Sequence, residues 1–492
     1  MSIEPREYQL FIISRILQAK SEGKNVIVEL DAGMGKRVIS YLLTRYMEED
    51  EKLLFITPSR ASVKDTYNFF KDQIDSSELG ERKVGYIGSN MPRKYREYVI
   101  KNSDIVIVTP ITLANILEKS AELRKFDYIF INEVDKAVRR TAHIPYYDKI
   151  TDYLSSFQLV YPWPKLKRLL PKDACWVGLS GTLRDYQTLR VEDDVIFKRD
   201  LETIAELLFP EGKPIDFIFM DSILKLPDTH KYVVKNMTII KTIPVRDDKI
   251  KLLLDALTDE IYNVTRILAS RYTNENDPIV SSEKIERIIS KLPSDDVYKM
   301  KFLRLALVRK FVTASVPKHY IRFLRRPSIM RLIRGMDENF NVEDLTGSSK
   351  IKKIADIAEE WVKRDKKIAV LTSYIVTARE IKENLEKRNI KTFLITGKTP
   401  NKGEIIERFK KHEGGVVLIL TPVGERDLDL PNVELLLIHD IINTVKTMYQ
   451  RFKRGRRAFV AIVYYEDTYE KNKVNKLLQR IKERYPWSII MD

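Results

Sequence analysis

Short apolar runs alternate with amphipathic stretches in two regions of the chain. In residues 1–215 the apolar runs are Asn25–Leu30, Leu53–Thr57, Ile105–Thr109, Tyr128–Ile131 and Cys175–Ser180. Residues 350–492 repeat the pattern with Ile368–Thr372, Thr392–Thr396, Val416–Leu420, Leu435–Ile438 and Phe459–Tyr464. Apolar runs without polar alternation are typical of strands that are buried on both faces of a parallel sheet. The pattern predicts two doubly wound α/β domains.

Helical periodicity accompanies these runs and dominates the middle of the chain. In the second region it predicts helices at Lys350–Lys363, Val376–Arg388 and Lys402–Lys411. Residues 246–336 show almost no strand pattern, and the expected helices are Asp247–Tyr272, Lys284–Lys291, Tyr298–Thr313 and His319–Arg334. We therefore expect a first α/β domain at 1–225, a crossover with a helical insertion at 226–340, and a second α/β domain at 341–492. The insertion should sit on the second domain.

Composition narrows the class of protein. No apolar run approaches the ~20 residues of a membrane span, and no signal-peptide pattern begins the chain. The single cysteine, Cys175, excludes intramolecular disulfides and Cys-rich zinc sites, so we expect an intracellular, cytoplasmic protein. The 86 Lys and Arg residues against 70 Asp and Glu give a net charge of +16. This excess fits either a polyanion partner or a lysine-rich solvated surface.

The first strand run leads into a glycine-rich loop, formed by Gly33, Met34, Gly35, Lys36 and Arg37. Glycines let backbone N–H groups face phosphates, and a lysine at the following helix start neutralises the β- and γ-phosphates. The loop predicts an ATP site, although a chance Gly-Lys turn would look similar. Arg37 stands where such loops carry the Ser or Thr that binds Mg²⁺.

A second polar pair follows the strand run Tyr128–Ile131. Glu133 could polarise an attacking water, and Asn132 offers only a neutral carbonyl oxygen where a carboxylate is usual. A neutral oxygen is a weaker partner for Mg²⁺, so Asn132 is at best a poor metal ligand. An ordinary polar strand end is the alternative interpretation.

Further short elements occur in a fixed order along the chain. Arg6 and Gln9 lie upstream of the loop, where Gln9 could contact adenine. Ser59, Arg60 and Thr109 lie at strand ends that would line a nucleic-acid track. The remaining elements are Ser180-Gly181-Thr182, Thr372-Ser373-Tyr374, Thr421-Pro422, Gly424–Pro431 and Gln450–Arg457.

In this order and spacing the chain resembles superfamily 2 helicases over nearly its whole length. It is most similar to the group of the archaeal Hef helicase domain, the Fanconi-anaemia M translocase and the RIG-I-like proteins. Three features carry this likeness: Thr372-Ser373-Tyr374 followed by Thr377-Ala378, the string Gly424–Pro431, and the helical insertion. The resemblance implies two RecA-like domains and nucleic-acid-dependent ATP hydrolysis.

The resemblance also implies roles for single residues. Lys36, Glu133, Arg454 and Arg457 would be catalytic, the two arginines as arginine fingers. Asp429, Gln450 and Arg451 would contact the nucleotide or the Asn132–Asp135 element, and Thr372, Tyr374 and Thr421 the nucleic acid. Asp427, Lys453 and Arg456 stand in place of the usual glycines, which suggests altered loop geometry.

The insertion carries its own charge pattern. From Lys299 to Met336 there are eleven Lys and Arg residues and no Asp or Glu. Basic residues at helical spacing normally find acidic partners four positions away, so we expect Arg309, Lys310, Arg322, Arg325 and Arg326 to bind backbone phosphates. A solvated face is the alternative. The interleaved aromatic residues fit a helical core better than base-stacking surfaces.

Three functions remain open. The first is an ATP-dependent translocase or helicase on branched or duplex DNA, with impaired Mg²⁺ coordination and therefore weak hydrolysis. The second is a pseudo-helicase scaffold that binds ATP and DNA but hydrolyses little. The third is a helicase subunit that works with a separate nuclease in repair or CRISPR-type defence, since no nuclease segment follows Trp487.

Overall fold

The computed structural model describes residues 3–31, 33–75, 82–88, 90–120, 125–140, 157–181, 186–191, 194–235, 237–272, 288–289, 292–293, 295–422, 432–441, 445–454, 459–487 and 489–491. The chain divides into two compact units, Met1–Asn236 and Met237–Asp492. This single division falls between the boundaries expected from the sequence, because the crossover segment is shared between the units. Among the described residues, no helix combines the length and apolar character that a membrane span requires.

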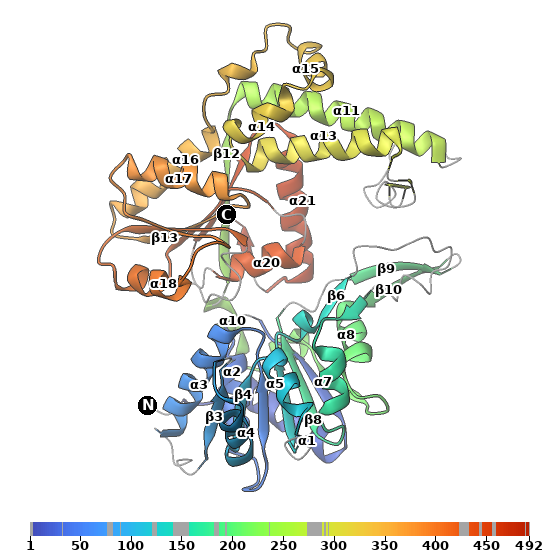
Figure 1. Ribbon diagram of the computed structural model, residues 1–492, viewed down its shortest axis with the longest axis vertical. Coiled ribbons are helices and arrows are strands. Elements are labelled where there is room, and N and C mark those ends of the chain that lie inside the picture. The colour runs from blue at the N-terminus through green and yellow to red at the C-terminus, as the bar shows by residue number, and fades with distance from the viewer. Residues whose placement is uncertain are drawn as a thin grey trace. The chain divides into compact units, whose positions relative to one another are not determined.

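Unit 1, coloured blue to green in Figure 1, is built on a seven-stranded sheet. The strand order is β11-β1-β8-β5-β2-β4-β3, and every pairing is parallel. Its strands are β1 (Asn25–Glu29), β2 (Leu53–Ile56), β3 (Val84–Ile87), β4 (Ile105–Val108), β5 (Tyr128–Asn132), β8 (Cys175–Ser180) and β11 (Ile215–Ile218). Its helices are α1 (Glu7–Ser21), α2 (Lys36–Leu43), α3 (Arg60–Asp75), α4 (Arg93–Asn102), α5 (Pro110–Leu117), α7 (Trp163–Leu169), α8 (Asp200–Leu208), α9 (Met220–Leu224) and α10 (Thr229–Lys235). The five predicted strands are all present.

Two antiparallel pairs stand beside this sheet: β6 (Val138–Arg140) with β7 (Phe157–Leu159), and β9 (Tyr186–Val191) with β10 (Asp194–Arg199). These four strands were not predicted from the sequence. In the main sheet, β1, β2, β4 and β8 are buried along their whole length. This burial on both faces explains their continuous apolar sequences.

Unit 2 also contains a seven-stranded parallel sheet, in the order β14-β15-β13-β16-β17-β12-β18. Its strands are β12 (Thr238–Val245), β13 (Lys367–Leu371), β14 (Thr392–Ile395), β15 (Val416–Leu420), β16 (Leu435–Ile438), β17 (Phe459–Tyr465) and β18 (Ile489–Met491). The helices beside it are α16 (Ser349–Val362), α17 (Ile375–Glu386), α18 (Lys402–Lys411), α20 (Val445–Arg454) and α21 (Tyr469–Arg484). The prediction of two doubly wound α/β domains is confirmed.

Strand β12 was not predicted, and it places the insertion within unit 2. It pairs with β17 from Ile239 opposite Phe459 to Val245 opposite Tyr465, and with β18 on its other edge. Because β12 leads directly into α11 (Asp248–Tyr272), the insertion lies between two strands of one sheet. The remaining insertion helices are α13 (Val297–Ala314), α14 (Pro317–Leu324) and α15 (Pro327–Arg334), and none of the described residues from 248 to 345 forms a strand.

The predicted helix His319–Arg334 is instead two helices, α14 and α15. Pro327 occupies the first turn of α15, where its missing N–H removes no intrahelical hydrogen bond. Inside one longer helix the same proline would break the hydrogen-bond ladder. The predicted helix Lys284–Lys291 lies largely outside the described residues.

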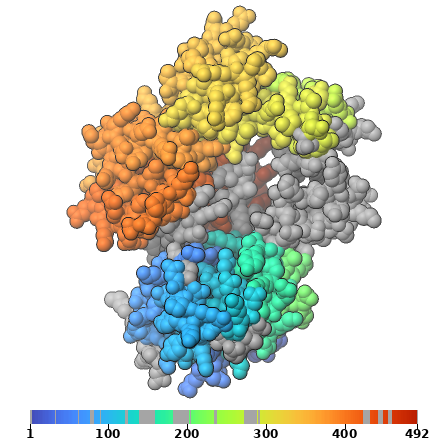
Figure 2. All heavy atoms as spheres, in the orientation of Figure 1, coloured from blue at the N-terminus to red at the C-terminus, as the bar shows by residue number. Residues whose placement is uncertain are grey.

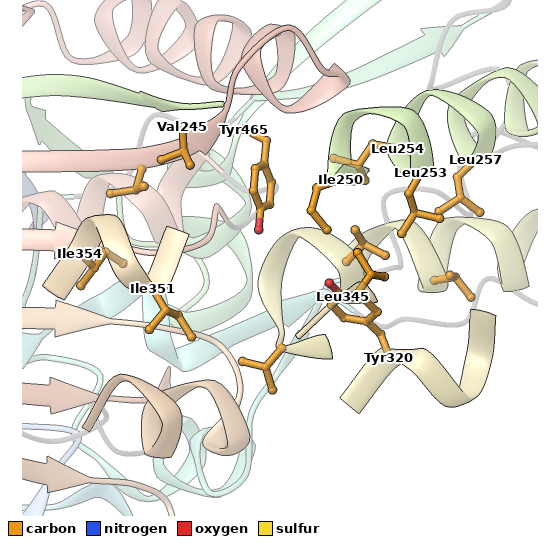
Figure 3. Close-up of a cluster of buried hydrophobic side chains, with 14 of the residues drawn as sticks. Val245, Ile250, Leu253, Leu254, Leu257, Tyr320, Leu345, Ile351, Ile354 and Tyr465 are labelled. Carbon is orange, nitrogen blue, oxygen red and sulfur yellow. The ribbon is translucent and has the colours of Figure 1, made fainter. Parts of the chain in front are cut away.

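The insertion and the second sheet share one hydrophobic core (Figure 3). Leu253, Leu254 and Leu257 of α11 belong to the same buried cluster as Ile351 and Ile354 of α16. Tyr320 of α14, at 1% exposure, also belongs to this cluster. The insertion is therefore packed on unit 2.

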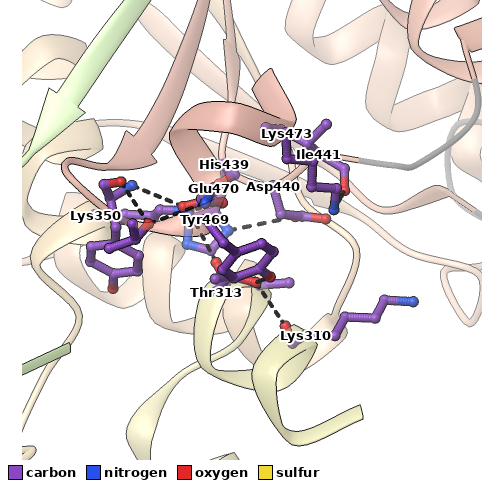
Figure 4. Close-up of polar contacts among 12 residues, drawn as sticks. Lys310, Thr313, Lys350, His439, Asp440, Ile441, Tyr469, Glu470 and Lys473 are labelled. Carbon is purple, nitrogen blue, oxygen red and sulfur yellow. Dashed lines mark hydrogen bonds and ion pairs between the residues drawn. The ribbon is translucent and has the colours of Figure 1, made fainter. Parts of the chain in front are cut away.

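A buried ion pair fastens the end of α13 to this unit (Figure 4). Lys350, which is fully buried, donates from Nζ to Glu470 Oε1 at 2.6 Å, to Thr313 O at 3.1 Å and to His439 O at 3.4 Å. The second oxygen of Glu470 accepts from the backbone N–H of Tyr465 at 2.8 Å. Both charges are thus paired and hydrogen-bonded, as burial requires.

Candidate nucleotide and nucleic-acid site

In unit 1, the predicted polar residues gather at one edge of the sheet. The glycine-rich loop follows β1, Asn132 ends β5, and Ser180 ends β8. Ser59 and Thr109 follow β2 and β4. Because these five strands are consecutive in a parallel sheet, their carboxyl ends meet at one edge, where open α/β sheets bind ligands.

The glycine-rich loop has the backbone that its glycines permit. Gly33 and Gly35 both have φ of 85°, a left-handed conformation that a side chain disfavours. A Cβ on Gly35 would also lie 2.8 Å from Gln9 Nε2. Lys36 begins α2 and donates to the carbonyl oxygens of Leu30 at 2.7 Å and Asp31 at 3.2 Å. The loop therefore presents backbone and one ammonium group at a helix N-terminus.

Helix α1 braces this loop. The Tyr8 hydroxyl donates to Met34 O at 2.7 Å, and Gln9 Nε2 lies 3.5 Å from the same oxygen. Gln9 Oε1 accepts from the backbone N–H of Arg6 at 3.0 Å, while the Arg6 guanidinium lies 4.2 Å from the centre of the Tyr232 ring. Burial raises the pKa of Tyr8, which keeps its hydroxyl protonated as a donor.

Sequence reasoning missed Tyr8 in this role. The one indication in the sequence was the position of Tyr8 beside Gln9. Its contact with the glycine-rich loop is visible only in the structure. Gln9 braces the loop in this structure, and its contact with adenine stays a prediction.

The residues after β5 form the opposite side of this edge. Asn132 directs Nδ2 toward Thr57 Oγ1, at 3.5 Å. Glu133 has φ of 55° and ψ of 52°, an uncommon left-handed conformation for a residue with a side chain, and its carboxylate pairs with Lys136. Backbone strain of this kind is found at functional sites. The buried Asp135 accepts a hydrogen bond from the Ser180 hydroxyl at 2.6 Å.

The two positions expected to hold a metal differ in what they offer. Arg37 lies half-buried in the first turn of α2, and its side chain carries no oxygen atom that could bind a metal ion. Asn132 retains one neutral carbonyl oxygen. Across the described part of the chain, no group of three or more His, Cys, Asp or Glu side chains is arranged to hold a metal ion.

The nucleic-acid residues predicted in unit 1 differ in exposure. Ser59 is buried, and its hydroxyl accepts from the backbone N–H of Ser62 at 3.1 Å. Thr109 precedes α5, and its hydroxyl donates to Thr112 Oγ1 at 2.9 Å. Arg60 is exposed at the start of α3. Of these three residues, Arg60 is exposed, Thr109 is half-buried and Ser59 is buried.

Unit 2 places its predicted residues at the carboxyl edge of its own sheet. Thr372 and Thr421 follow the neighbouring strands β13 and β15, and both are buried. Tyr374 is half-buried at the N-cap of α17. Asp440, which was not predicted from the sequence, follows β16 and accepts from the backbone N–H of Ser373 at 2.7 Å and from its hydroxyl.

Asp440 links this strand edge to α20. Burial acts to raise the pKa of Asp440, but His439, Arg451 and Ser373 outweigh it and hold that pKa below its usual range. Arg451 is only 2% exposed, whereas Gln450 is half-buried. Lys453, in place of a glycine, is buried with its ammonium 5.9 Å from the Tyr449 ring centre. Asp429, Arg457 and the side chain of Arg454 lie outside the described residues.

Several insertion cations find partners on other elements. Lys318 pairs with Glu380 at 3.2 Å and Arg325 with Glu343 at 2.7 Å, while Lys301 pairs with Glu260. Arg309 lies 4.1 Å from the Tyr469 ring centre and donates to Thr258 Oγ1 at 3.2 Å. Burial lowers the pKa of Arg309.

Between Lys299 and Met336, six cations are exposed and have no acidic partner within the described ranges: Arg304, Lys310, Arg322, Arg326, Arg331 and Arg334. Of the five residues expected to bind phosphates, Lys310, Arg322 and Arg326 belong to this set. Arg309 and Arg325 already have partners in the fold.

Comparison with known proteins agrees with this arrangement. Residues 6–189 match the DEAD/DEAH box helicase family, and residues 349–459 match the helicase conserved C-terminal domain. The helicase domain of Hef from Pyrococcus furiosus has a similar structure, with a TM-score of 0.60, 19% identity, and coverage of 96% of this chain and 98% of that one. The helicase MrfA bound to DNA has a TM-score of 0.55 and 14% identity, over 99% of this chain and 49% of that one.

Two curated relatives match nearly the whole chain. A Methanocaldococcus jannaschii protein named as an ATP-dependent RNA helicase is 22% identical over 94% of this chain and 58% of its own length. Human RIG-I, an antiviral innate immune response receptor, is 20% identical over 92% of this chain and 53% of its own. The chain spans somewhat over half the length of these relatives.

Proposed function

We propose, from the premise that this chain is a superfamily 2 helicase similar to Hef and RIG-I, that it is an ATP-dependent translocase or helicase acting on branched or duplex DNA. Proteins with these domains use ATP, typically with Mg²⁺, and bind nucleic acid. The observation that carries the proposal is the convergence of the glycine-rich loop, Glu133 and Ser180 on one sheet edge. This edge supplies hydrogen-bond donors for phosphates, the carboxylate of Glu133, and the buried hydrogen bond between Ser180 and Asp135.

The residues of unit 1 divide the work at this edge. The loop amides and Lys36 bind the phosphates. Before ATP binds, the hydrogen bonds from Lys36 to the carbonyl oxygens of Leu30 and Asp31 hold its ammonium group in the loop. Glu133 orients the attacking water once its carboxylate leaves Lys136. The bond between Asp135 and Ser180 transmits the state of this loop to β8. Arg454 and Arg457 are the proposed arginine fingers.

The metal positions do not fit Mg²⁺ well. Mg²⁺ favours an octahedral set of oxygen ligands, and carboxylates are its usual protein ligands. Arg37 supplies none, and Asn132 supplies one neutral oxygen while its nitrogen faces Thr57. We therefore assign no step to the metal. The cation of Arg37 can offset part of the phosphate charge, and hydrolysis is expected to be weak.

The poor fit of Arg37 and Asn132 to Mg²⁺ favours a second candidate, a pseudo-helicase scaffold that binds ATP and DNA and hydrolyses little. Glu133 and the Asp135–Ser180 bond are the features that a pure scaffold would not require. DNA is preferred because MrfA has this fold and is seen bound to DNA. The M. jannaschii relative is named for RNA, so RNA is the competing substrate.

Steady-state ATPase separates the candidates. Hydrolysis is measured with forked DNA, blunt duplex DNA and duplex RNA across Mg²⁺ and Mn²⁺ concentrations, and nucleotide binding is measured in parallel. Lys36→Ala is the matched control because it removes the phosphate-binding ammonium. The proposal expects ATP binding and DNA-stimulated hydrolysis that Lys36→Ala abolishes. Binding with no stimulated hydrolysis supports the scaffold, and stimulation by RNA alone corrects the substrate.

A further inference from the structure

Four aromatic rings from three elements meet where the insertion joins the second sheet. Phe311 comes from the last turn of α13, His319 and Phe323 from α14, and Tyr374 from the N-cap of α17. The Phe311 ring centre lies 4.9 Å from that of His319, 5.1 Å from that of Phe323 and 5.6 Å from that of Tyr374. His319 and Tyr374 are 5.7 Å apart. We call these four residues the aromatic cluster.

The aromatic cluster lies at the margin of the buried core: Phe311 and Phe323 pack against that core but are not enclosed by it. Tyr320, from the same helix, is 1% exposed and belongs to the core, whereas all four rings of the cluster are half-buried. An ordinary core side chain at these positions would be enclosed, as Tyr320 is. Figure 2 shows the exposed surface that the yellow insertion helices present.

Two arginines without acidic partners lie on this cluster. The guanidinium carbon of Arg322 is 4.7 Å from the Phe323 ring centre, and that of Arg326 is 5.5 Å away. Both side chains are exposed, and no carboxylate among the described residues pairs with either. Neighbouring Arg325 differs, since it pairs with Glu343. The surface therefore combines half-exposed aromatic rings with two available cations.

We propose that the aromatic cluster binds an unpaired nucleobase of a branched nucleic acid, with Arg322 and Arg326 binding the phosphates on either side. This inference rests on the proposed function and names the part of the substrate that the insertion contacts. Every base has a π-face, so stacking on such rings is tolerant of sequence, and cationic side chains follow the backbone. A helicase that acts at a branch meets unpaired bases there.

The contacts within the aromatic cluster are compatible with the stacking of a nucleobase on it. Guanidinium groups lie over Phe323, and a base can stack on the guanidinium plane or replace it on the ring. The Ser315 hydroxyl lies 2.7 Å from His319 Nδ1 and fixes the imidazole. Burial and the nearby Arg322 lower the pKa of His319, so the ring is neutral at neutral pH. A neutral ring adds an aromatic surface without repelling the two arginines.

The test uses forked DNA and forked RNA with 2-aminopurine at the first unpaired position of the branch. Stacking quenches this base, so the full-length protein should lower its fluorescence on binding. Phe311→Leu combined with Phe323→Leu keeps apolar volume but removes two stacking faces. This double variant should lose the quench and bind the fork ~10-fold more weakly, with unchanged affinity for blunt duplex.

Tyr298→Leu is the matched control. Tyr298 lies on the same insertion with Arg271 4.3 Å from its ring centre, and it is no member of the cluster. This variant should quench and bind like the unmodified protein. If the double variant, shown to be folded by its thermal unfolding, quenches and binds the fork unchanged, the cluster proposal is overturned and the proposed function stands. Absence of binding to both fork and duplex by the unmodified protein overturns both.

Discussion

Ser180 donates a 2.6 Å hydrogen bond to Asp135, and both side chains are buried. The bond joins the end of β8 to the loop that begins with Glu133. Strands β5 and β8 are hydrogen-bonded neighbours in the sheet, so a shift at the end of one strand displaces the end of the other. Ser180 at the end of β8 is thus connected, through Asp135, to the segment that follows Glu133, the carboxylate proposed to act in hydrolysis.

Ser180→Ala should weaken that connection. A hydrogen bond to a charged group contributes about 2 kcal/mol, so the free energy of unfolding should fall by about that amount. Stimulation of ATP hydrolysis by nucleic acid should fall more than basal hydrolysis, because Glu133 is then less well held. Thr44→Ala, which removes a buried hydroxyl that donates to Tyr41 O, is the control. Equal effects of both variants on stimulation would contradict the coupling role.

Restoring both metal positions should raise the kcat of ATP hydrolysis. Arg37→Thr and Asn132→Asp together supply a hydroxyl and a carboxylate for Mg²⁺. Either change alone should do less, because one ligand leaves the ion poorly held. All four proteins are assayed with saturating DNA. Turnover already at the ~1–10³ s⁻¹ typical of enzymes, with no gain in the double variant, would refute the impaired site.

Arg322→Ala combined with Arg326→Ala should weaken fork binding by about the same factor for all DNA sequences, because phosphate contacts carry no sequence information. For each phosphate that the protein no longer neutralises, the slope of log affinity against log salt should fall by ~0.9. Arg325→Ala provides the comparison, since Arg325 already pairs with Glu343 and should change the slope less. Identical slopes for the unmodified protein, the double variant and Arg325→Ala would show that Arg322 and Arg326 do not bind phosphates.

Lys350→Met should destabilise unit 2 strongly. It leaves Glu470 buried without its cation, and breaking a buried pair in this way costs about 3–5 kcal/mol. Lys350→Met with Glu470→Leu removes both charges and should recover much of that stability. Urea unfolding of the three proteins measures the difference. A double variant less stable than the single would show that the pair itself stabilises the unit.

Acid should destabilise unit 2 through Asp440. Its folded-state pKa lies below that of an unfolded aspartate, ~3.9. Its contribution to the free energy of unfolding is therefore complete above pH ~4 and is lost as pH falls toward the folded-state pKa. Asp440→Asn should lower stability at pH 7 and flatten its decline between pH ~5 and pH ~3, measured by thermal unfolding. An unchanged decline would assign the acid sensitivity to other groups.

The strands predicted correctly are buried along most of their length. Strands such as β2 and β15 are buried along their whole length, so their apolar runs were visible without tertiary information. Strand β12 mixes buried, half-buried and exposed positions and contains Lys241 and Pro244, so its sequence shows no continuous apolar run. Only its partners β17 and β18 reveal it as a strand.

The candidate site divides in the same way. The glycine-rich loop and Glu133 were recognisable because local spacing defines them. The contacts of Tyr8 with Met34, and of Asp440 with Ser373, depend on segments that are distant in sequence. Local pattern could place Arg309 and Arg325 among the cations but could not show that Tyr469 and Glu343 already engage them.

Strand β12 also has a consequence for how the chain folds during synthesis. It leaves the ribosome before the insertion and before β13, β14, β15 and β16, yet both of its neighbours, β17 and β18, come later still. Both hydrogen-bonding edges of β12 therefore wait for distant partners, the slowest kind of contact to form. A charged residue and a proline make a strand a poor template for pairing with another chain. Lys241 and Pro244 would protect nascent β12 from aggregation during that interval.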